Sequence, residues 1–594
     1  MPVSADRRRV AVIGSGLAGL TTAYLLKREG VEVWIIEKSD RLGFHSASVE
    51  IPLGLDEAVQ VIGPSAGKKQ SKGRKGGPRW IVDVPMRSFQ GGYYPLLIAL
   101  YRHLNIPMIP TYWTFSFSHL TSTPKPDTKP YFIHTGASGS AIPSLPSKSY
   151  ASPRALTRAI ASFLGTACAY LLWVVIAALG WHDLLPLRHG RQTTLRHMTA
   201  RVSHHLTYPL SYFSHSLPRA SALASPLGNV FEAFVYDIIL PLFSAVGTMT
   251  TSDVLDTSIG SLLDYVHSTV GTSHFTLAPG ISAGTVAMRL AEEVGAQGEG
   301  YLRVGEEVLD LVYSAGEGNI TVKCRGGDIE VDQVVLATQA SAAAVLLGML
   351  EKTLKAGAEA ERSRVSGMRD ALSEVEYRET IVVTHRDRSI LPGKADQREI
   401  NLSTPLSTTP RGFTQDEDVA MTPALSTSSS VSSPGPSSPG SPSPYGQIPF
   451  FAPRDGCVYT MGTHIVPPPA SLRQQGIDVA EVLQTTNPVC PIDAETVLAV
   501  SRMERALPLR DPTIFKRLHP SSSPTSHPAL IHLAGSYAYP GIPLLEGCVG
   551  SAINATSVIL GKPRQEIGGL DWSTGRGGRL GRIWRWRRSG IVDR

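Results

Sequence analysis

Six residues near the N-terminus have the types and spacing that suit them to holding a phosphate group. Gly14, Ser15, Gly16, Leu17, Ala18 and Gly19 form the pattern Gly-x-Gly-x-x-Gly between an apolar run, 10–13, and a segment of helical spacing, 17–28. There Gly14 permits a tight turn, Gly16 lets backbone approach a pyrophosphate, and Gly19 lets helix and strand pack closely. The free N–H groups at the start of the helix favour negative charge. The pattern predicts a strand–turn–helix unit that binds a dinucleotide.

A carboxylate stands where the second strand of this unit should end. Residues 31–36 form another apolar run, and Glu37 follows it, with Lys38 next. A carboxylate at this place can accept the hydroxyls of an adenosine ribose and repels a 2′-phosphate. A glycine-rich turn of an ordinary α/β domain is the alternative, but the complete β-α-β-Glu arrangement favours nucleotide binding.

The segment after Glu37 resembles that of a flavoprotein superfamily. "KSDRLGFHSAS" (38–48) is similar to the continuation in amine oxidases and phytoene desaturases, where Arg-x-Gly-Gly carries the chain back past the pyrophosphate. Arg41, Leu42 and Gly43 match this pattern, whereas Phe44 replaces the second glycine. His45 aligns with a position that is often basic in the family. The resemblance implies that these residues bind the cofactor.

Two distant segments resemble the same superfamily and imply that the cofactor is FAD. "LAGSYAYPGIPLLEGCVGSA" (533–552) is similar to the C-terminal flavin segment, in which Gly535 would approach the ribityl-pyrophosphate and the N–H groups of Leu545 and Glu546 would face the flavin. Ser536 replaces the acidic residue that is usual there. "YLRVGEEVLDL" (301–311) resembles the hairpin that places Val308 against the adenine.

The fold class expected is α/β, with a Rossmann-type FAD-binding domain (glutathione-reductase/p-hydroxybenzoate-hydroxylase-like) built from discontinuous segments and an α+β substrate domain. The chain has 594 residues, which is long enough to form two hydrophobic cores. The FAD domain is predicted at 7–62, 79–84, 276–350 and 525–562, and the substrate domain at 85–275 and 351–524. The remaining segments are a basic loop at 63–78, a Pro/Ser-rich, poorly ordered insert at 121–153, a disordered Ser/Pro-rich insert at 403–446 and a basic Trp/Arg tail at 563–594.

The resemblance implies an FAD-dependent oxidoreductase, and a lipophilic substrate that is oxidised or desaturated by hydride transfer to flavin N5 is favoured. The aromatic residue that amine oxidases usually carry two positions before the Glu-Gly is Leu544 here, with Tyr537 and Tyr539 as nearby substitutes. A peroxide-producing amine oxidase and a non-catalytic flavin-binding scaffold remain alternatives. No catalytic residue is named, because His385 and Asp387 are more readily explained as a surface pair than as an acid–base pair.

The substrate's route is suggested by 22 uncharged residues, 160–181. They are long enough to cross a bilayer, but one crossing would separate the two flavin segments, and the next apolar stretch, 234–247, contains Asp237 and Pro241. A helix dipping into one leaflet, a buried core or channel-lining helix, and a true span with a re-entry that the sequence does not reveal are all open. The Trp/Arg tail favours a membrane surface over nucleic acid, and a disordered, solvated tail remains the alternative. Five scattered cysteines without close pairs predict neither disulfides nor a metal site, and without a secretory signal an intracellular location is expected.

Overall fold

The computed structural model describes residues 8–43, 48–53, 60–62, 80–85, 88–121, 127–136, 141–181, 193–208, 225–314, 318–354, 359–406, 450–451, 458–511, 513–519, 529–570 and 572. His45, the basic loop 63–78, most of the insert 403–446 and the tail from 573 on lie outside them.

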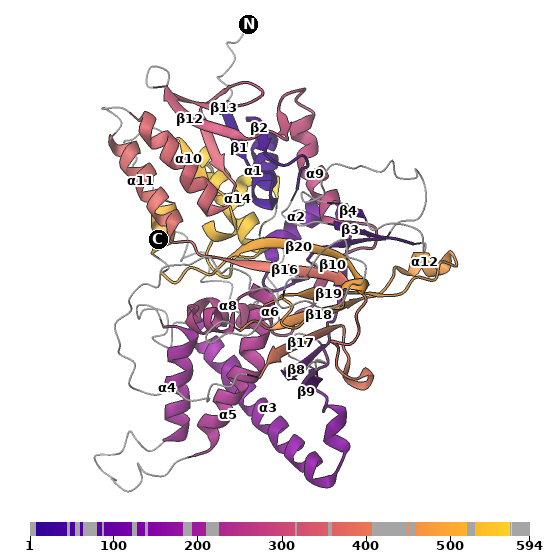
Figure 1. Ribbon diagram of the computed structural model, residues 1–594. Coiled ribbons are helices and arrows are strands. Elements are labelled where there is room, and N and C mark those ends of the chain that lie inside the picture. The colour runs from indigo at the N-terminus through magenta and orange to yellow at the C-terminus, as the bar shows by residue number, and fades with distance from the viewer. Residues whose placement is uncertain are drawn as a thin grey trace, which may run out of the picture.

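A parallel five-stranded sheet confirms the Rossmann-type α/β domain. Its order is β11-β2-β1-β15-β21, and every neighbouring pair is parallel. The strands are β1 (Arg9–Ile13), β2 (Glu32–Glu37), β11 (Leu302–Val304), β15 (Gln333–Leu336) and β21 (Ile531–Leu533). Segments from both ends of the chain therefore pair within one sheet, as the discontinuous domain requires (Figure 1).

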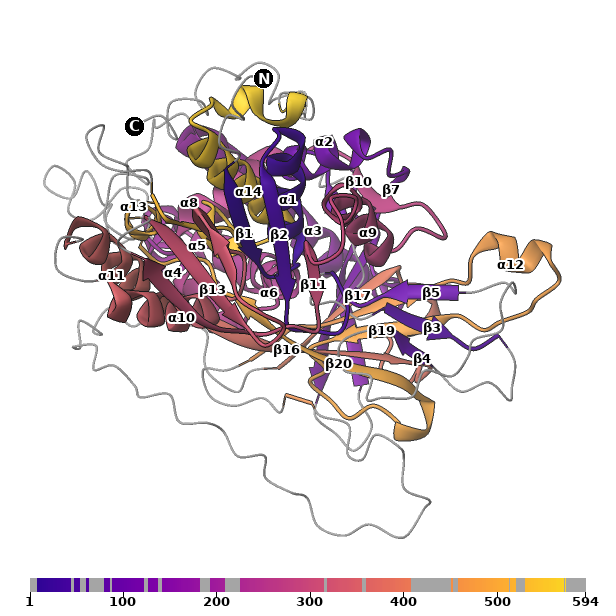
Figure 2. The ribbon, with the colours of Figure 1, turned by 90° about the horizontal axis from the view of Figure 1, so that it is seen from above.

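Both faces of this sheet are covered, which explains why its strands are apolar without alternation. In β1, Val10 and Val12 join the core cluster of the helices on one face, while Ala11 and Ile13 join the cluster on the other. The first face carries α1 (Leu17–Arg28), α9 (Ala283–Gly295) and α14 (Leu545–Leu560), and Figure 2 shows α1 and α14 beside β1 and β2. The second carries β12 (Val308–Ser314), β13 (Asn319–Cys324), β14 (Ile329–Val331), α10 (Ala340–Thr353), α11 (Glu359–Ser373) and α13 (Ile514–Leu518).

A seven-stranded sheet forms the centre of the predicted substrate domain. Its order is β20-β16-β19-β18-β17-β8-β9, and all pairs are antiparallel except β17 with β8. The strands are β20 (Val497–Ala506), β16 (Tyr377–His385), β19 (Val482–Thr486), β18 (Met461–Val466), β17 (Ile400–Pro405), β8 (Phe115–Thr121) and β9 (Asp127–His134).

Two small sheets and two short helices complete the α/β part of the chain. One sheet contains β6 (Phe89–Gln90), β10 (His274–Leu277) and β7 (Met108–Thr111), and the other contains β4 (Gln60–Ile62), β3 (Ser48–Ile51) and β5 (Trp80–Asp83). The helices are α2 (Pro95–His103) and α12 (Ala470–Gln474). Val49 and Trp80 pack with Val382 and Val482 of the seven-stranded sheet. The sheet of β3, β4 and β5, predicted as part of the FAD domain, therefore packs against the predicted substrate domain.

A layer of helices lies below the Rossmann domain and beside the seven-stranded sheet (Figure 1), and its buried side chains join the core cluster of the Rossmann helices. It consists of α3 (Pro153–Trp181), α4 (Leu195–Thr207), α5 (Leu227–Phe234), a π-helical turn (Val235–Ile239), α6 (Leu240–Gly247), α7 (Thr251–Asp256) and α8 (Ile259–Thr269). The π turn joins α5 and α6 into one apolar helix, Leu227–Gly247, of mean hydropathy 1.7. A second helix long enough to cross a membrane is therefore present, contrary to the sequence expectation.

Three predicted boundaries differ from the structure. Residues 127–134 of the insert expected to be poorly ordered form β9, which pairs with β8 because its apolar side chains complete the sheet edge. Residues 403–405 of the second insert belong to β17. The start of the predicted tail is ordered, since Ile567, Leu570 and Trp572 are buried in the Rossmann-domain core.

Candidate functional site

A cavity of about 870 Å³ lies between the Rossmann sheet and the seven-stranded sheet. Its walls include the first glycine turn at residues 14–18 and the C-terminal segment at 535–537 and 543–545. Strands β17, β18, β19 and β20 contribute residues from the opposite side. The fold therefore brings segments more than 500 positions apart to one cavity, whose volume lies within the size range of small-molecule sites.

The first glycine turn has the backbone that its pattern predicted. Gly14 adopts a φ of +102° and donates its N–H to the carbonyl of Ile36, and a Cβ there would lie 2.7 Å from the oxygen of Ala337. A Cβ on Gly19 would lie 2.0 Å from the oxygen of Gly14, so helix α1 passes directly over the turn. By contrast, a Cβ on Gly16 meets no protein atom within 4 Å and Gly16 lines the cavity.

Glu37 ends β2 at the cavity with most of its hydrogen-bonding capacity used. Its Oε2 accepts from the backbone N–H and the hydroxyl of Ser15, both at 2.8 Å, and its Oε1 accepts from the N–H of Ser39 at 2.9 Å. A carboxylate offers about four acceptor positions, so about one remains, on Oε1. Glu37 thus ties the glycine turn to the end of β2 and still has an acceptor for a ligand hydroxyl.

The C-terminal segment forms the other end of the cavity wall. Gly535 donates its N–H to the hydroxyl of Ser551 at 2.9 Å, which holds the turn after β21 against α14. Leu545 is the first residue of α14 and lines the cavity, as does Ser536. The N-termini of α1 and α14 therefore both border the cavity, and each carries a partial positive charge.

Most residues predicted to bind the cofactor line this cavity. They are Gly14, Ser15, Gly16, Leu17, Ala18, Glu37, Lys38, Arg41, Leu42, Gly43, Val308, Gly535, Ser536 and Leu545. Gly19 does not line the cavity, but its lack of a side chain lets α1 pack against the glycine turn that does. Glu546 does not line the cavity, because its buried carboxylate accepts the N–H groups of Leu96 and Leu97 at 3.0–3.1 Å and caps α2. His45 lies outside the described residues.

The two tyrosines considered as substitutes for an amine cage have other contacts. Tyr537 borders the cavity, but it is buried, its ring packs on Gly535 and its hydroxyl donates to the carbonyl of Thr338 at 3.3 Å. Burial also raises the pKa of Tyr537 far above its usual value. Tyr539 packs on Gly550 and under the guanidinium of Arg564 and does not line the cavity.

The wall contributed by the predicted substrate domain was not itself predicted from the sequence. Its aromatic residues include Tyr94, Trp113, Phe115 and Tyr265, and its histidines are His274 and His464. Desolvation lowers the pKa of both imidazoles to about 4, with His134 adding to the effect at His274, so both are uncharged at neutral pH. These residues come from separate strands and helices and share no local pattern, so only the tertiary structure brings them together.

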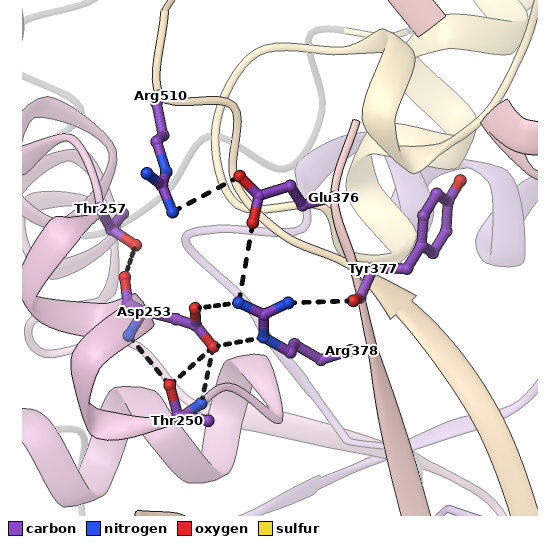
Figure 3. Close-up of polar contacts among 7 residues, drawn as sticks. All are labelled: Thr250, Asp253, Thr257, Glu376, Tyr377, Arg378 and Arg510. Atoms are coloured by element: carbon purple, nitrogen blue, oxygen red, sulfur yellow. Dashed lines mark hydrogen bonds and ion pairs between the residues drawn. The ribbon is translucent and has the colours of Figure 1, made fainter. Parts of the chain in front are cut away.

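An ion pair between a half-buried arginine and a buried aspartate fixes the helical layer to the wall of the cavity (Figure 3). Arg378 at the start of β16 donates Nε and Nη2 to the carboxylate of Asp253 in α7, at 3.0 and 2.9 Å. Asp253 also accepts from Thr250 in a capping box, and Glu376 bridges Arg378 to Arg510. The neighbouring Tyr377 lines the cavity and accepts the N–H of Ala340, the first residue of α10, at 2.7 Å.

His385 and Asp387 are buried structural residues rather than a surface pair. The Nδ1 of His385 accepts the N–H of Asp387 at 3.1 Å, so its Nε2 carries the proton and donates to the hydroxyl of Thr485 at 2.7 Å. Desolvation lowers the pKa of His385 to about 4. Neither residue lines the cavity.

Comparisons with known proteins found a family match and similar solved structures. Residues 12–104 match the family described as NAD(P)-binding Rossmann-like domain, and no curated protein matches the chain significantly. Among solved structures, cyclohexylamine oxidase from Brevibacterium oxydans IH-35A is similar over 93% of this chain and 98% of its own, at 12% identity and a TM-score of 0.43.

Two further solved structures give similar values. Wild-type putrescine oxidase bound to putrescine covers 94% of this chain and 99% of its own, at 12% identity and a TM-score of 0.44. A putative protoporphyrinogen oxidase from Exiguobacterium sp. 255-15 covers 93% and 98%, at 12% identity and a TM-score of 0.44. At these values, function has to be argued from the site itself.

Proposed function

We propose that this protein is an FAD-dependent oxidoreductase that oxidises or desaturates a lipophilic substrate by hydride transfer to flavin N5. The observation that carries this proposal is the single cavity bordered by the first glycine turn, the C-terminal segment and the substrate sheet. A ligand that fills it contacts a dinucleotide-type site at one end and a separate, largely uncharged wall at the other.

The residues present fit FAD. The open side of Gly16 leaves room for a pyrophosphate, and the N-terminus of α1 favours its charge. The remaining acceptor position on Glu37 suits a ribose hydroxyl, and Val308 offers an apolar contact for an adenine. The N-terminus of α14 suits the electron-rich edge of a flavin. Bound FAD would supply the two-electron acceptor.

The chain's own residues would bind and orient the substrate and exclude water. Tyr94, Trp113, Phe115 and Tyr265 offer aromatic surface, and the neutral imidazole of His274 offers a hydrogen bond without a charge. An uncharged, largely apolar molecule loses little hydration free energy on entering such surroundings, whereas a cation loses much more. This favours a lipophilic substrate.

The absorption spectrum of the purified full-length protein tests the proposal first. A visible flavin band, with FAD released on denaturation at about one molecule per chain, is expected. The bound flavin should be photoreduced and then reoxidised by an added electron acceptor. Protein that binds no flavin even after incubation with FAD would refute the cofactor assignment, and flavin that resists reduction or reoxidation would support a scaffold role instead.

An amine oxidase is the second candidate, and one observation favours it. Glu504 on β20 lines the cavity and is exposed, so its carboxylate is available to attract an ammonium group at the rim. Hydrogen peroxide release with polyamines or aryl-alkylamines, reduced in Glu504→Gln, would support this candidate. Glu379→Gln, on the strand position opposite Glu504, is the matched control.

A further inference from the structure

Helix α3 exposes an apolar stripe on the surface of the protein. Ile160, Leu164, Leu171 and Val175 are 44, 57, 63 and 51% exposed, and their spacing of four and seven residues places them on one side of the helix. The opposite side packs into the protein, where Trp173 is fully buried against Phe231 and Phe234 of α5. The helix is therefore attached to the helical layer along one side only.

This exposure distinguishes α3 from a core helix. The apolar 18-residue window of α3 has a mean hydropathy of 2.1, but only 17% of that window is buried within the protein. The second apolar helix, Leu227–Gly247, is different, because 44% of its window is buried and Leu242, Ala245 and Val246 line the cavity. That helix lines the cavity, so within the described residues α3 has no other long apolar helix with which to cross a bilayer and return.

The sequence on either side of α3 is rich in basic residues. Residues 128–231 contain nine lysines and arginines but one acidic residue, Asp183, although the whole chain has a net charge of only +6. Lys148, Arg154 and Arg158 are exposed at the start of α3, and the exposed Tyr150 lies beside them in the 3-10 helix Ser147–Tyr150. A basic rim with an aromatic residue next to an apolar stripe suits the headgroup region of an anionic bilayer.

We propose that the exposed stripe of α3 inserts into the surface of an anionic lipid bilayer, with Lys148, Arg154 and Arg158 contacting the headgroups. The helix lies in the interface plane and does not span the membrane. This attachment needs no bound cofactor, so it is tested separately from the oxidoreductase proposal.

The test is co-sedimentation of the full-length protein with vesicles of phosphatidylcholine alone and of phosphatidylcholine mixed with phosphatidylserine. We expect the protein to pellet with the mixed vesicles and to be released by salt, because screening weakens the attraction of the basic rim. Leu164→Gln combined with Leu171→Gln should lower the partition coefficient by about tenfold or more, because both side chains leave water on insertion. Arg154→Gln combined with Arg158→Gln should lower binding only to the mixed vesicles.

Met288→Gln combined with Val558→Gln is the matched control. These residues are 64 and 54% exposed on α9 and α14 of the Rossmann domain, and their replacement should leave vesicle binding unchanged. The proposal is overturned if the wild type stays in the supernatant with mixed vesicles at low salt, or if the α3 variant binds as the wild type does. It is also overturned if sedimentation without lipid shows that the stripe joins two copies of this chain and vesicles are not bound.

Discussion

The assignment of Glu37 as the ribose-binding carboxylate can be tested with the isosteric change Glu37→Gln. The carboxylate accepts three hydrogen bonds within the protein, two from Ser15 and one from Ser39, which leaves about one acceptor position for a ligand hydroxyl. A hydrogen bond to a charged group is worth about 1.5–3 kcal/mol. Its loss should therefore raise the dissociation constant for FAD about 10- to 150-fold.

The measurement is a titration of apoprotein with FAD, in which the quenching of flavin fluorescence reports binding. The matched control is Glu32→Gln at the other end of the same strand, where the carboxylate accepts the hydroxyl of Tyr301 and does not line the cavity. Thermal unfolding of both variants without FAD separates a binding effect from a loss of stability. If Glu37→Gln binds FAD within about twofold of the wild type, or if Glu32→Gln weakens binding equally, the ribose assignment is wrong.

Three further changes test the fold around the site. Gly16→Ala should leave the melting temperature unchanged but weaken FAD binding, because its Cβ enters the cavity. Gly19→Ala should destabilise the protein by about 3 kcal/mol or more, because its Cβ overlaps the oxygen of Gly14. Equal melting temperatures for the two variants would contradict this difference. Asp253→Asn should lower the free energy of unfolding by about 2 kcal/mol in denaturant titrations, because it removes the charge that accepts two hydrogen bonds from the half-buried Arg378. Glu379→Gln, in an exposed ion pair, should lower it by less than about 1 kcal/mol in the same denaturant titrations. The fold lowers the pKa of His385 from 6.5 to about 4, so protonation of this imidazole favours the unfolded chain. The free energy of unfolding should therefore fall as pH drops from about 6.5 toward 4, and it should fall less steeply in His385→Gln. Parallel pH profiles of the wild type and this variant would refute the assignment.

The structure adds to the sequence-based interpretation of the apolar run at 160–181 the side of the helix that is exposed. Hydropathy and length were compatible with a core helix and with a membrane-dipping helix, because neither property records which side of the helix is covered. The exposure of Leu164 and Leu171, opposite the buried Trp173, depends on the packing of α5 against α3. A second apolar helix was missed because the sequence shows Asp237 and Pro241 within it. In the structure a π turn carries the helix through Asp237, and Pro241 stands in the first turn of α6, where proline is tolerated.

The Rossmann unit and its glycine turn were predictable from the sequence alone. Gly14, Gly19 and Glu37 lie within one β-α-β unit, where strand pairing and helix packing act over short separations and leave a local pattern. The role of Glu546 was not predictable in this way, because its partners in α2 are about 450 positions away and only the folded chain brings them together. The same holds for Tyr94, His274 and His464, which meet at one wall because three sheets and a helical layer close around them. Local chemistry thus determined the dinucleotide-type half of the site, and long-range packing decided the half that would select a substrate.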